Sequence, residues 1–186
     1  MTTEQNRIIE ISKKHGLSHI SSCLTATPIL KEIYEIKKPE DLVVLDNAHA
    51  HLTHLLFTHP EHEEEFLRYG IHCDRKAGCD VSGGSLAHGV GISIGLALAN
   101  RKRSVYCMVS DGSMQEGSNW EALRIKGDLG LDNLKIYANL NGFTALAPID
   151  VNKLGDKLKL FCPDIELRFT ENPEGFEGVG GHYKKI

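Results

Sequence analysis

Short apolar runs alternate with longer amphipathic stretches along this chain. The runs at 42–45, 104–110 and 134–140 have the length and composition of strands buried on both faces. Longer stretches with helical spacing cover 86–100 and 116–128. This strand–helix–strand order predicts right-handed crossovers. The expected fold is therefore α/β, a parallel sheet flanked by helices.

The flanking segments are less regular. Pro28 is expected to open a helix that runs to about Ile36, because proline is favoured in the first turn of a helix. Ser85 is expected to cap the glycine-bearing helix 86–100. Further helices are expected over 3–14, 49–57 and 61–68, and a last strand over 165–169. Loops are expected over 70–84 and 142–160, the second with a Lys-rich helical turn. The Gly-rich tail is expected to lie over a functional site or at an interface.

Length and charge narrow the class of protein. A chain of 186 residues is expected to form one domain. Its net charge is −4, and it has no cluster of basic residues of the kind that binds nucleic acid. The apolar runs are too short to cross a membrane, and the first residues lack the apolar core of a secretion signal. Five scattered cysteines are expected to be reduced thiols of a cytoplasmic protein.

The candidate chemistry lies where two of the expected strands end. Asp111-Gly112 follows one apolar run, and Asn141-Gly142 follows the next. Carboxylate and amide oxygens are hard ligands that suit Mg²⁺ or Ca²⁺, with phosphate oxygens filling the remaining positions. Ligands bind outside the carboxyl ends of the strands in open α/β sheets. The spacing therefore predicts a divalent metal on a pyrophosphate.

These residues also carry a resemblance. The acid–Gly pair with its spaced Asn looks like the thiamine-diphosphate motif, and its surroundings resemble the transketolase branch of that superfamily. The likeness runs from about His15 to Phe143, and its segments occur in family order: Leu45–His49, Gly84–Gly91, Asp111–Gly117, Trp120–Ala122 and Leu131–Leu134.

The resemblance implies a thiamine-diphosphate-binding fold, with thiamine diphosphate and Mg²⁺ (or Ca²⁺) as cofactors. The implied metal ligands are Asp111, Asn141 and the main-chain carbonyl of Phe143. The implied catalytic residues are His19, His49 and Glu116. The implied cofactor contacts are His49, Gly84, Ser85, Leu86, Asp111, Gly112, Ser113, Glu116, Asn141 and His182.

The resemblance also implies a partner. Enzymes of this family need a second large domain that grips the aminopyrimidine ring and supplies an activating glutamate, and fewer than forty residues follow position 150. We therefore expect a separate chain to provide that domain, in a heterotetramer. The expected function is the diphosphate- and metal-binding subunit of a split transketolase-like enzyme. It would transfer a two-carbon ketol unit between sugar-type substrates.

Two departures from the family pattern keep alternatives open. Ser110 stands where a glycine is usual. Gly78-Cys79-Asp80-Val81 stands near where the family has Gly-His-Pro-Glu, so a donor-binding histidine is missing or moved. A 2-oxo acid decarboxylase or dehydrogenase component and a non-catalytic scaffold that retains the fold remain alternatives. A zinc site at Cys73 and Cys79 is weakly indicated, because their spacing matches no common zinc knuckle.

Overall fold

The computed structural model describes residues 1–60 and 68–186, so most of the helix expected over 61–68 lies outside the described residues. Within them, one sheet contains four parallel strands in the order β1-β2-β3-β4. The strands are β1 (Leu42–Leu45), β2 (Val105–Ser110), β3 (Leu134–Leu140) and β4 (Glu166–Phe169). The α/β fold expected from the sequence is confirmed.

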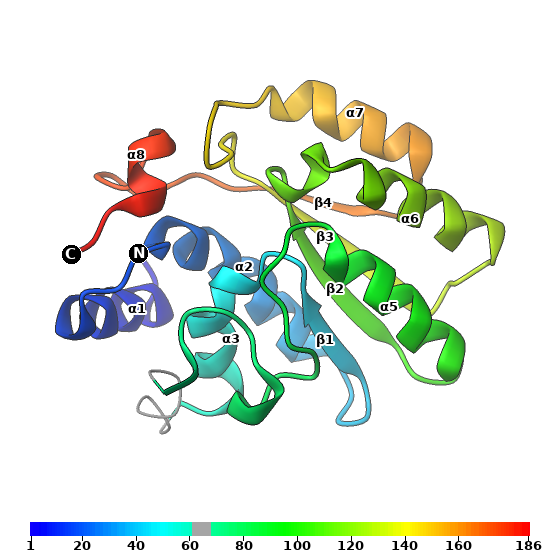
Figure 1. The fold of residues 1–186 in the computed structure, drawn as a ribbon, viewed down its shortest axis with the longest axis horizontal. Helices are drawn as coiled ribbons and strands as arrows, with labels where there is room; N and C mark the ends of the chain where they lie inside the picture. Colours follow the sequence, from blue (N-terminus) through cyan, green and yellow to red (C-terminus); the bar gives the residue numbers. More distant parts are fainter. Residues whose placement is uncertain (61–67) are drawn as a thin grey trace.

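Helices cover both faces of this sheet (Figure 1). Because neighbouring strands follow one another in the chain and crossovers are right-handed, the three crossover helices lie on one face. They are α5 (His88–Ala99), α6 (Gly117–Asp128) and α7 (Val151–Phe161). On the other face lies α2 (Ile20–Ile36), with α1 (Thr3–His15) and α3 (His51–Thr58) packed against it. In the described parts of the chain, no helix has the length and apolar character that crossing a bilayer requires.

Short elements complete the chain. The 3₁₀ turns are η1 (Ala48–Ala50), η2 (Arg75–Ala77) and η3 (Ser113–Gln115), and a last helix is α8 (Gly178–Tyr183). In Figure 1, α8 lies beside the amino-terminal helices rather than against the sheet, and it contacts α2. The carboxyl-terminal tail is thereby brought back to the start of the chain.

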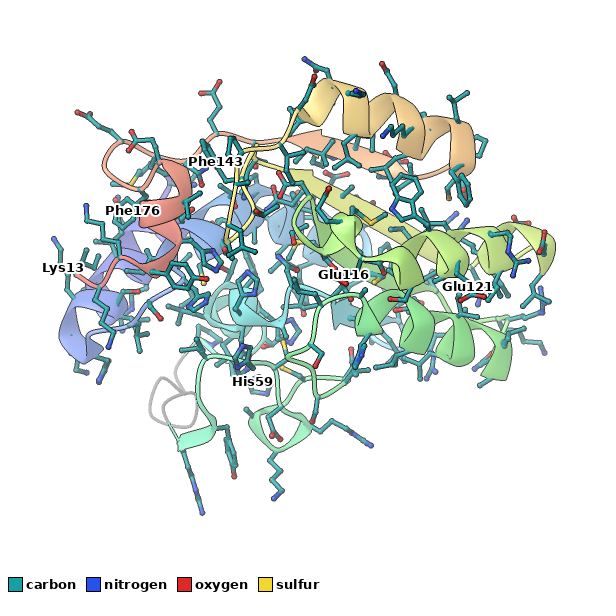
Figure 2. The ribbon with its side chains drawn as sticks, turned by 45° about the horizontal axis from the view of Figure 1, so that its top comes forward. Lys13, His59, Glu116, Glu121, Phe143 and Phe176 are labelled. Atoms are coloured by element: carbon teal, nitrogen blue, oxygen red, sulfur yellow. The ribbon has the colours of Figure 1, made fainter. Side chains whose placement is uncertain are left out.

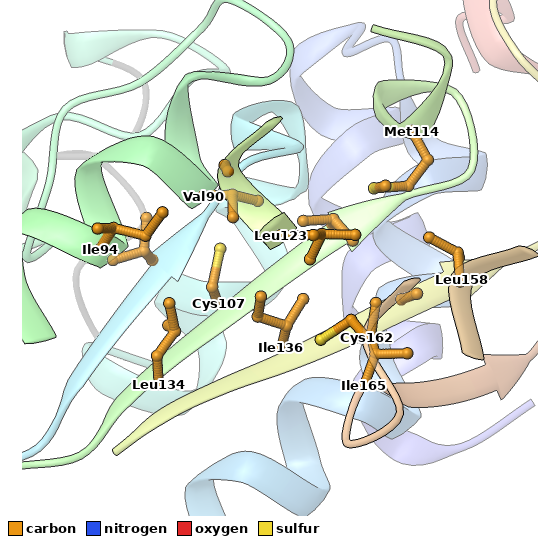
Figure 3. Close-up of a cluster of buried hydrophobic side chains, with 14 of the residues drawn as sticks. Val90, Ile94, Cys107, Met114, Leu123, Leu134, Ile136, Leu158, Cys162 and Ile165 are labelled. Atoms are coloured by element: carbon orange, nitrogen blue, oxygen red, sulfur yellow. The ribbon is translucent and has the colours of Figure 1, made fainter. Parts of the chain in front are cut away.

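The strands have the alternation of a sheet buried on both faces. Cys107 of β2 and Ile136 of β3 point into the cluster beneath the crossover helices, with Val90 and Leu123 packed above them (Figure 3). Met108, one residue further along β2, packs into the opposite cluster with residues of α2. The central strands are therefore fixed in register by apolar contacts on both sides.

Pro28 does not open a helix, which corrects the sequence expectation. It lies inside α2, in a helix that already begins at Ile20. A proline has no N–H, so the carbonyl of Leu24 loses its helical donor. The side-chain nitrogen of Gln5 donates to that carbonyl at 3.0 Å. A contact from another helix thus satisfies the carbonyl that the proline would leave unpaired.

Two more boundaries differ from the sequence expectation. Ser85 does not cap α5, which begins at His88 without a side-chain bond from its own cap residue. Instead, the carboxylate of Asp46 accepts from the backbone nitrogen of Gly89 at 2.6 Å. Residues 151–161, expected to hold only a helical turn, form the full helix α7. The side chain of Asp150 caps α7, and Leu154 and Leu158 are buried beneath it.

Candidate functional site

The loops after β2 and β3 lie side by side because parallel strands end at the same edge of the sheet. Asp111 follows the last residue of β2, and its buried carboxylate reaches the loop after β3. Its Oδ2 accepts from the backbone nitrogens of Asn141 at 2.9 Å and Gly142 at 2.7 Å. Its Oδ1 accepts from the nitrogen of Gly112 at 2.9 Å. One carboxylate therefore fixes both loops.

The loop after β3 is a tight turn with a polar lining. The Oδ1 of Asn141 accepts from the backbone nitrogen of Phe143 at 3.0 Å. Gly142 has a φ of 90°, a left-handed conformation that glycine adopts without strain. Burial raises the pKa of Asp111 to about 6, although hydrogen bonds from the backbone of these loops lower it. The carboxylate is thus a desolvated charge held by backbone donors.

A cavity of about 200 Å³ opens over these loops. One wall is formed by the turn residues that follow the strands, and the opposite wall by histidines from the α2 and α3 side of the sheet. Of the residues named from the sequence as metal ligands, cofactor contacts or catalytic groups, the cavity contains His19, His49, Gly84, Leu86, Asp111, Gly112, Asn141, Phe143 and His182. The tertiary structure brings together segments that span most of the chain.

Three of the cavity histidines pack against one another. The ring centroids of His19 and His182 are 4.4 Å apart, and those of His19 and His49 are 5.3 Å apart. Burial, together with the neighbouring imidazoles, lowers the pKa of His49 to about 3 and that of His19 to about 4. Burial also lowers the pKa of His182. These rings are therefore neutral near pH 7, and each has one nitrogen that donates and one that accepts a hydrogen bond.

The backbone at His19 is unusual and is tied to the tail. His19 has a φ of 62°, a left-handed conformation that is uncommon for a residue with a side chain. Its nitrogen donates to the carbonyl of His182 at 3.1 Å, and Ser18 bonds to its Nδ1 at 2.9 Å. Since Gly178 and His182 both line the cavity, the Gly-rich tail lies over the site, as the sequence suggested.

Three of the residues named from the sequence do not line the cavity. The hydroxyl of Ser113 is buried and donates to Asp46, because the η3 turn directs it into the interior. Ser85 is exposed and lies between two cavity residues, Gly84 and Leu86. Glu116 is exposed at the start of α6, ahead of Glu121 on the same helix (Figure 2). In the described chain, the side chains of residues 85, 113 and 116 therefore make no contact with the cavity.

One histidine that the sequence analysis did not assign to the site lines the cavity. His72 lies in the loop before α5 and borders the cavity with His19 and His49. The available signal was Gly70-Ile71-His72-Cys73-Asp74, which has a Gly, a His and an acid in the order of the family's Gly-His-Pro-Glu segment, but with one residue inserted and Cys in place of Pro. The sequence expectation placed that segment near residues 78–81, whereas a histidine reaches the cavity from position 72.

Asp46 belongs to the Leu45–His49 segment, but the sequence analysis gave it no role of its own. It is buried and accepts from the nitrogens of Ala87 and Gly89 and from the hydroxyl of Ser113. It therefore connects the segment that carries Leu86 to the turn that follows Asp111. Its position after β1 was visible in the sequence, but its partners lie 41 or more positions away.

The donor set fits the cofactors that the resemblance implies. Asp111, Asn141 and Phe143 line the same cavity, and they carry a carboxylate, an amide oxygen and a main-chain carbonyl, which are oxygen ligands of the kind that Mg²⁺ and Ca²⁺ prefer. A Cβ built on Gly112 would lie 3.6 Å from the Cα of Thr144, which is ordinary van der Waals contact, so the loop that carries Thr144 lies directly beside the backbone of Gly112. Within residues 1–60 and 68–186, no three His, Cys, Asp or Glu side chains are grouped to hold a metal ion, so the candidate site offers a single carboxylate.

Comparisons with known proteins identify relatives of this chain. A family model described as 1-deoxy-D-xylulose-5-phosphate synthase matches residues 3–149. Transketolase-like protein 2 of Bos taurus is 33% identical over 182 residues, covering 81% of this chain and 27% of that protein. A protein of Actinobacillus succinogenes, named as one subunit of an apulose-4-phosphate transketolase, is 40% identical over 76 residues, covering 36% of this chain and 28% of that one.

A solved structure shows the same fold. The crystal structure of transketolase from Campylobacter jejuni superposes with a TM-score of 0.75 at 18% sequence identity, covering 96% of this chain and 39% of that one. The chain therefore has the thiamine-diphosphate-binding fold of transketolase-like enzymes. It belongs to the N-terminal domain family of 1-deoxy-D-xylulose-5-phosphate synthase. It spans about a third or less of the length of the curated relatives it matches.

Proposed function

We propose that this chain is the diphosphate- and metal-binding subunit of a split transketolase-like enzyme. The enzyme would transfer a two-carbon ketol unit between sugar-type substrates, with thiamine diphosphate and Mg²⁺ or Ca²⁺ as cofactors. The observation that carries the proposal is the shared cavity, in which Asp111, Asn141 and Phe143 lie opposite His19, His49 and His182.

When bound, thiamine diphosphate supplies a carbanion that attacks a carbonyl, and a ring that stores the electrons as a carbon–carbon bond breaks. The residues of this chain would hold and orient it. Asp111, Asn141 and the Phe143 carbonyl would bind the metal on the diphosphate. Gly112 would leave room for the phosphate groups to approach the backbone. Gly84 and Leu86 would contact the aminopyrimidine ring.

The neutral histidines favour a polyhydroxylated substrate. A neutral imidazole both donates and accepts hydrogen bonds, which matches the hydroxyl groups of a sugar. His49 and His19 would orient substrate oxygens and move protons between them, and His72 lies beside them in the cavity. The cavity has no Lys or Arg among its described lining residues, so this chain offers no cation to the free carboxylate of a 2-oxo acid. That favours ketol transfer over decarboxylation.

The surface next to the cavity favours a partner chain. Helix α5 exposes an uncharged face that includes Gly91, Ile92 (39% exposed) and Leu98 (42% exposed). Leu86 lines the cavity and is itself 40% exposed, so this face begins at the mouth of the cavity. A partner that covered α5 would bury apolar surface and close the cavity in one step. The relative from Actinobacillus succinogenes is itself named as a subunit, which supports an assembly of unlike chains, proposed here as a heterotetramer.

The function is tested by assaying ketol transfer from a ketose donor to an aldehyde acceptor. The chain alone, with thiamine diphosphate and Mg²⁺, is expected to give no turnover, whereas the assembly purified through a tag on this chain is expected to be active. Robust turnover by the chain alone would contradict the split arrangement. Release of CO₂ from a 2-oxo acid without ketol transfer would contradict the reaction.

The metal site is tested by calorimetry on the same assembly. Asp111→Asn is nearly isosteric and removes the charge on the proposed ligand. It is expected to abolish the Mg²⁺ dependence of thiamine diphosphate binding. Asp156→Asn, a change on the exposed face of α7, is the matched control and is expected to bind as the unchanged protein does. Equal affinity in the two variants would contradict the assignment.

A further inference from the structure

The carboxylate of Asp46 joins two segments that flank the cavity. Asp46 follows the last residue of β1 and is 2% exposed. Its Oδ2 accepts from the nitrogen of Ala87 at 3.3 Å and from the hydroxyl of Ser113, and its Oδ1 accepts from the nitrogen of Gly89 at 2.6 Å. It is not among the described residues that line the cavity. Donors from two segments therefore converge on one buried side chain outside the cavity.

The hydroxyl of Ser113 closes these groups into a network. It donates to Asp46, and it accepts from the nitrogen of Ala87 and from the Nδ2 of Asn119, each at 3.0 Å. A serine hydroxyl has one proton and two lone pairs, so each is already used here. Because Ser113 has no lone pair left for a further donor, the atom of residue 46 that faces it has to be an acceptor.

The segment held by Asp46 has an unusual backbone. Ala87 has a φ of 64°, which is uncommon for a residue with a side chain, and the bonds to its nitrogen stabilise this conformation. Leu86, directly before it, lines the cavity, as does Gly84. On the other side, a Cβ built on Gly89 would lie 2.6 Å from the Cα of Asp46, so the start of α5 packs tightly on this residue. The position of Leu86 therefore depends on Asp46.

The turn at the other side of the cavity has supports of its own. The carboxylate of Asp111 accepts from three backbone nitrogens, at 2.7–2.9 Å, in the loops that follow β2 and β3. None of these three bonds involves Asp46. Loss of the Asp46 carboxylate would therefore release the segment that carries Leu86, while the turn at Asp111 stays in place.

We propose that Asp46 is a positioning residue that fixes Leu86 relative to the turn at Asp111. It would thereby set the spacing between the subsite for the aminopyrimidine ring and the subsite for the diphosphate. This rests on the proposed function, which assigns the two subsites to the cavity. A ligand that spans both subsites gains affinity from a fixed spacing, because less freedom is lost when it binds. A ligand that fills only the diphosphate subsite gains nothing from it.

Asp46→Asn tests the proposal with almost no change in shape. An amide has one acceptor oxygen, whereas the carboxylate uses both of its oxygens. If the amide nitrogen takes the place of Oδ1, it faces the N–H of Gly89. If it takes the place of Oδ2, it faces the N–H of Ala87 and a Ser113 hydroxyl that has no free lone pair. Either orientation loses at least one bond of the network.

Asp41→Asn is the matched control. Asp41 lies directly before β1, at the opposite end of the strand from Asp46, and is 6% exposed. Its carboxylate also accepts from backbone nitrogens on both oxygens, those of Lys38 and Ser104, each at 2.9 Å. The two variants therefore make the same chemical change in similarly buried carboxylates. A general loss of stability would appear in both, whereas a loss of spacing would appear in Asp46→Asn alone.

Calorimetry on the assembly compares two ligands in the presence of Mg²⁺. Thiamine diphosphate reaches both subsites, and inorganic pyrophosphate reaches one. Asp46→Asn is expected to weaken thiamine diphosphate about tenfold and to change pyrophosphate by less than about twofold. Asp41→Asn is expected to change both by less than about twofold. Equal weakening of the two ligands by Asp46→Asn, no weakening of either, or the same selective loss in Asp41→Asn would overturn the proposal.

Ser113→Ala is the second variant, and it decides the question if Asp46→Asn does not fold. It removes the hydroxyl between the η3 turn and Ala87 but leaves the Asp46 carboxylate with both of its backbone donors. It is expected to weaken thiamine diphosphate severalfold without a matching loss for pyrophosphate. Equal changes for the two ligands in Ser113→Ala would count against the network as the link between the subsites.

Amide hydrogen exchange on the chain without ligand tests the positioning separately from the proposed function. Asp46→Asn is expected to speed exchange at Ala87 and Gly89 at least about tenfold, and to leave Asn141 and Gly142, which donate to Asp111, as they are. Equal acceleration at all four amides, or none at Ala87 and Gly89, would overturn the positioning. An unchanged assembly that binds no thiamine diphosphate would contradict the proposed function instead, and the exchange result would still decide whether Asp46 holds the Leu86 segment.

Discussion

The carboxylate of Asp111 and the backbone nitrogen of Asn141 are 2.9 Å apart, although 30 positions separate the residues in the chain. This bond joins the loops that follow the two central strands. With the bonds from Gly142 and Gly112, backbone nitrogens take both lone pairs of Oδ2 and one of Oδ1, which leaves one lone pair of Oδ1 for a ligand. The same residue therefore has a structural role that can be measured without a cofactor.

Replacing Asp111 by alanine is expected to lower the free energy of unfolding by about 2 kcal/mol, because backbone donors in both loops lose a charged acceptor. Burial of the carboxylate opposes part of that loss. Urea unfolding of the chain without cofactor measures the change. Asp156→Ala, on the exposed face of α7, is the control, and it should stay within about 0.5 kcal/mol. Similar values for the two variants would show that the loops are held by other contacts.

The stability of the chain is expected to fall in mild acid. The pKa of His49 is lowered from 6.5 to about 3 in the folded state. Below pH 6.5 the unfolded chain therefore binds more protons than the folded chain, and the stabilisation by neutral His49 is lost as pH falls towards 3. At pH 5 the loss is about 2 kcal/mol from His49, and His19 contributes in the same direction.

Urea unfolding at pH 7.5 and pH 5 measures this dependence. His49→Gln is expected to flatten it, because the variant has no proton to gain at that position. His88→Gln changes an exposed histidine and is the control, so the pH dependence of its free energy of unfolding should equal that of the unchanged chain. A dependence as steep in His49→Gln as in the unchanged chain would contradict the assignment.

Two glycines of α5 are expected to respond oppositely to alanine. A Cβ on Gly89 would lie 2.6 Å from the Cα of Asp46, so Gly89→Ala should cost about 1–3 kcal/mol. Gly91 has no heavy atom within 4 Å of the same position, so Gly91→Ala should stabilise the helix by up to about 1 kcal/mol. Thermal unfolding of both variants decides the point, and equal effects would mean that Gly89 can move away from Asp46.

The proposed partner surface predicts a variant that affects assembly alone. Ile92→Glu places a charge on the exposed face of α5 and should change the free energy of unfolding of this chain by less than about 0.5 kcal/mol. It should weaken association with the partner at least about tenfold, since a buried unpaired charge costs more than about 1.4 kcal/mol. Leu160→Glu, at a residue 86% exposed on α7, is the control. Sedimentation velocity measures the association. If both variants assembled as the unchanged chain does, α5 would not be the surface that binds the partner.

Local sequence patterns were sufficient to predict the elements whose structure depends on nearby residues. The apolar runs located β1, β2 and β3, because strands that are buried on both faces of a parallel sheet are predominantly apolar. The bounds of helices α1 and α6 were predicted to within about two residues, because helical spacing of apolar residues is also a local pattern. Asp111 and Asn141 could be paired from sequence because parallel strands deliver their following residues to one edge.

Local signals failed where a distant group satisfies a backbone atom. Pro28 is tolerated inside α2 because Gln5 donates to the Leu24 carbonyl, and α5 is capped by Asp46 rather than by Ser85. Ser113 was expected to contact the cofactor, but its hydroxyl donates to Asp46, which is distant in the sequence. His72 was missed because it lies in a loop, where spacing carries little information about direction.

The sequence by itself determined the parallel sheet, the positions of its strand ends and the residues Asp111 and Asn141 that follow them, because hydrophobic periodicity and strand direction are local properties of the chain. Only the tertiary structure decided which residues line the cavity and which histidines are neutral. Those properties depend on burial and on partners many positions away, and no local pattern encodes either.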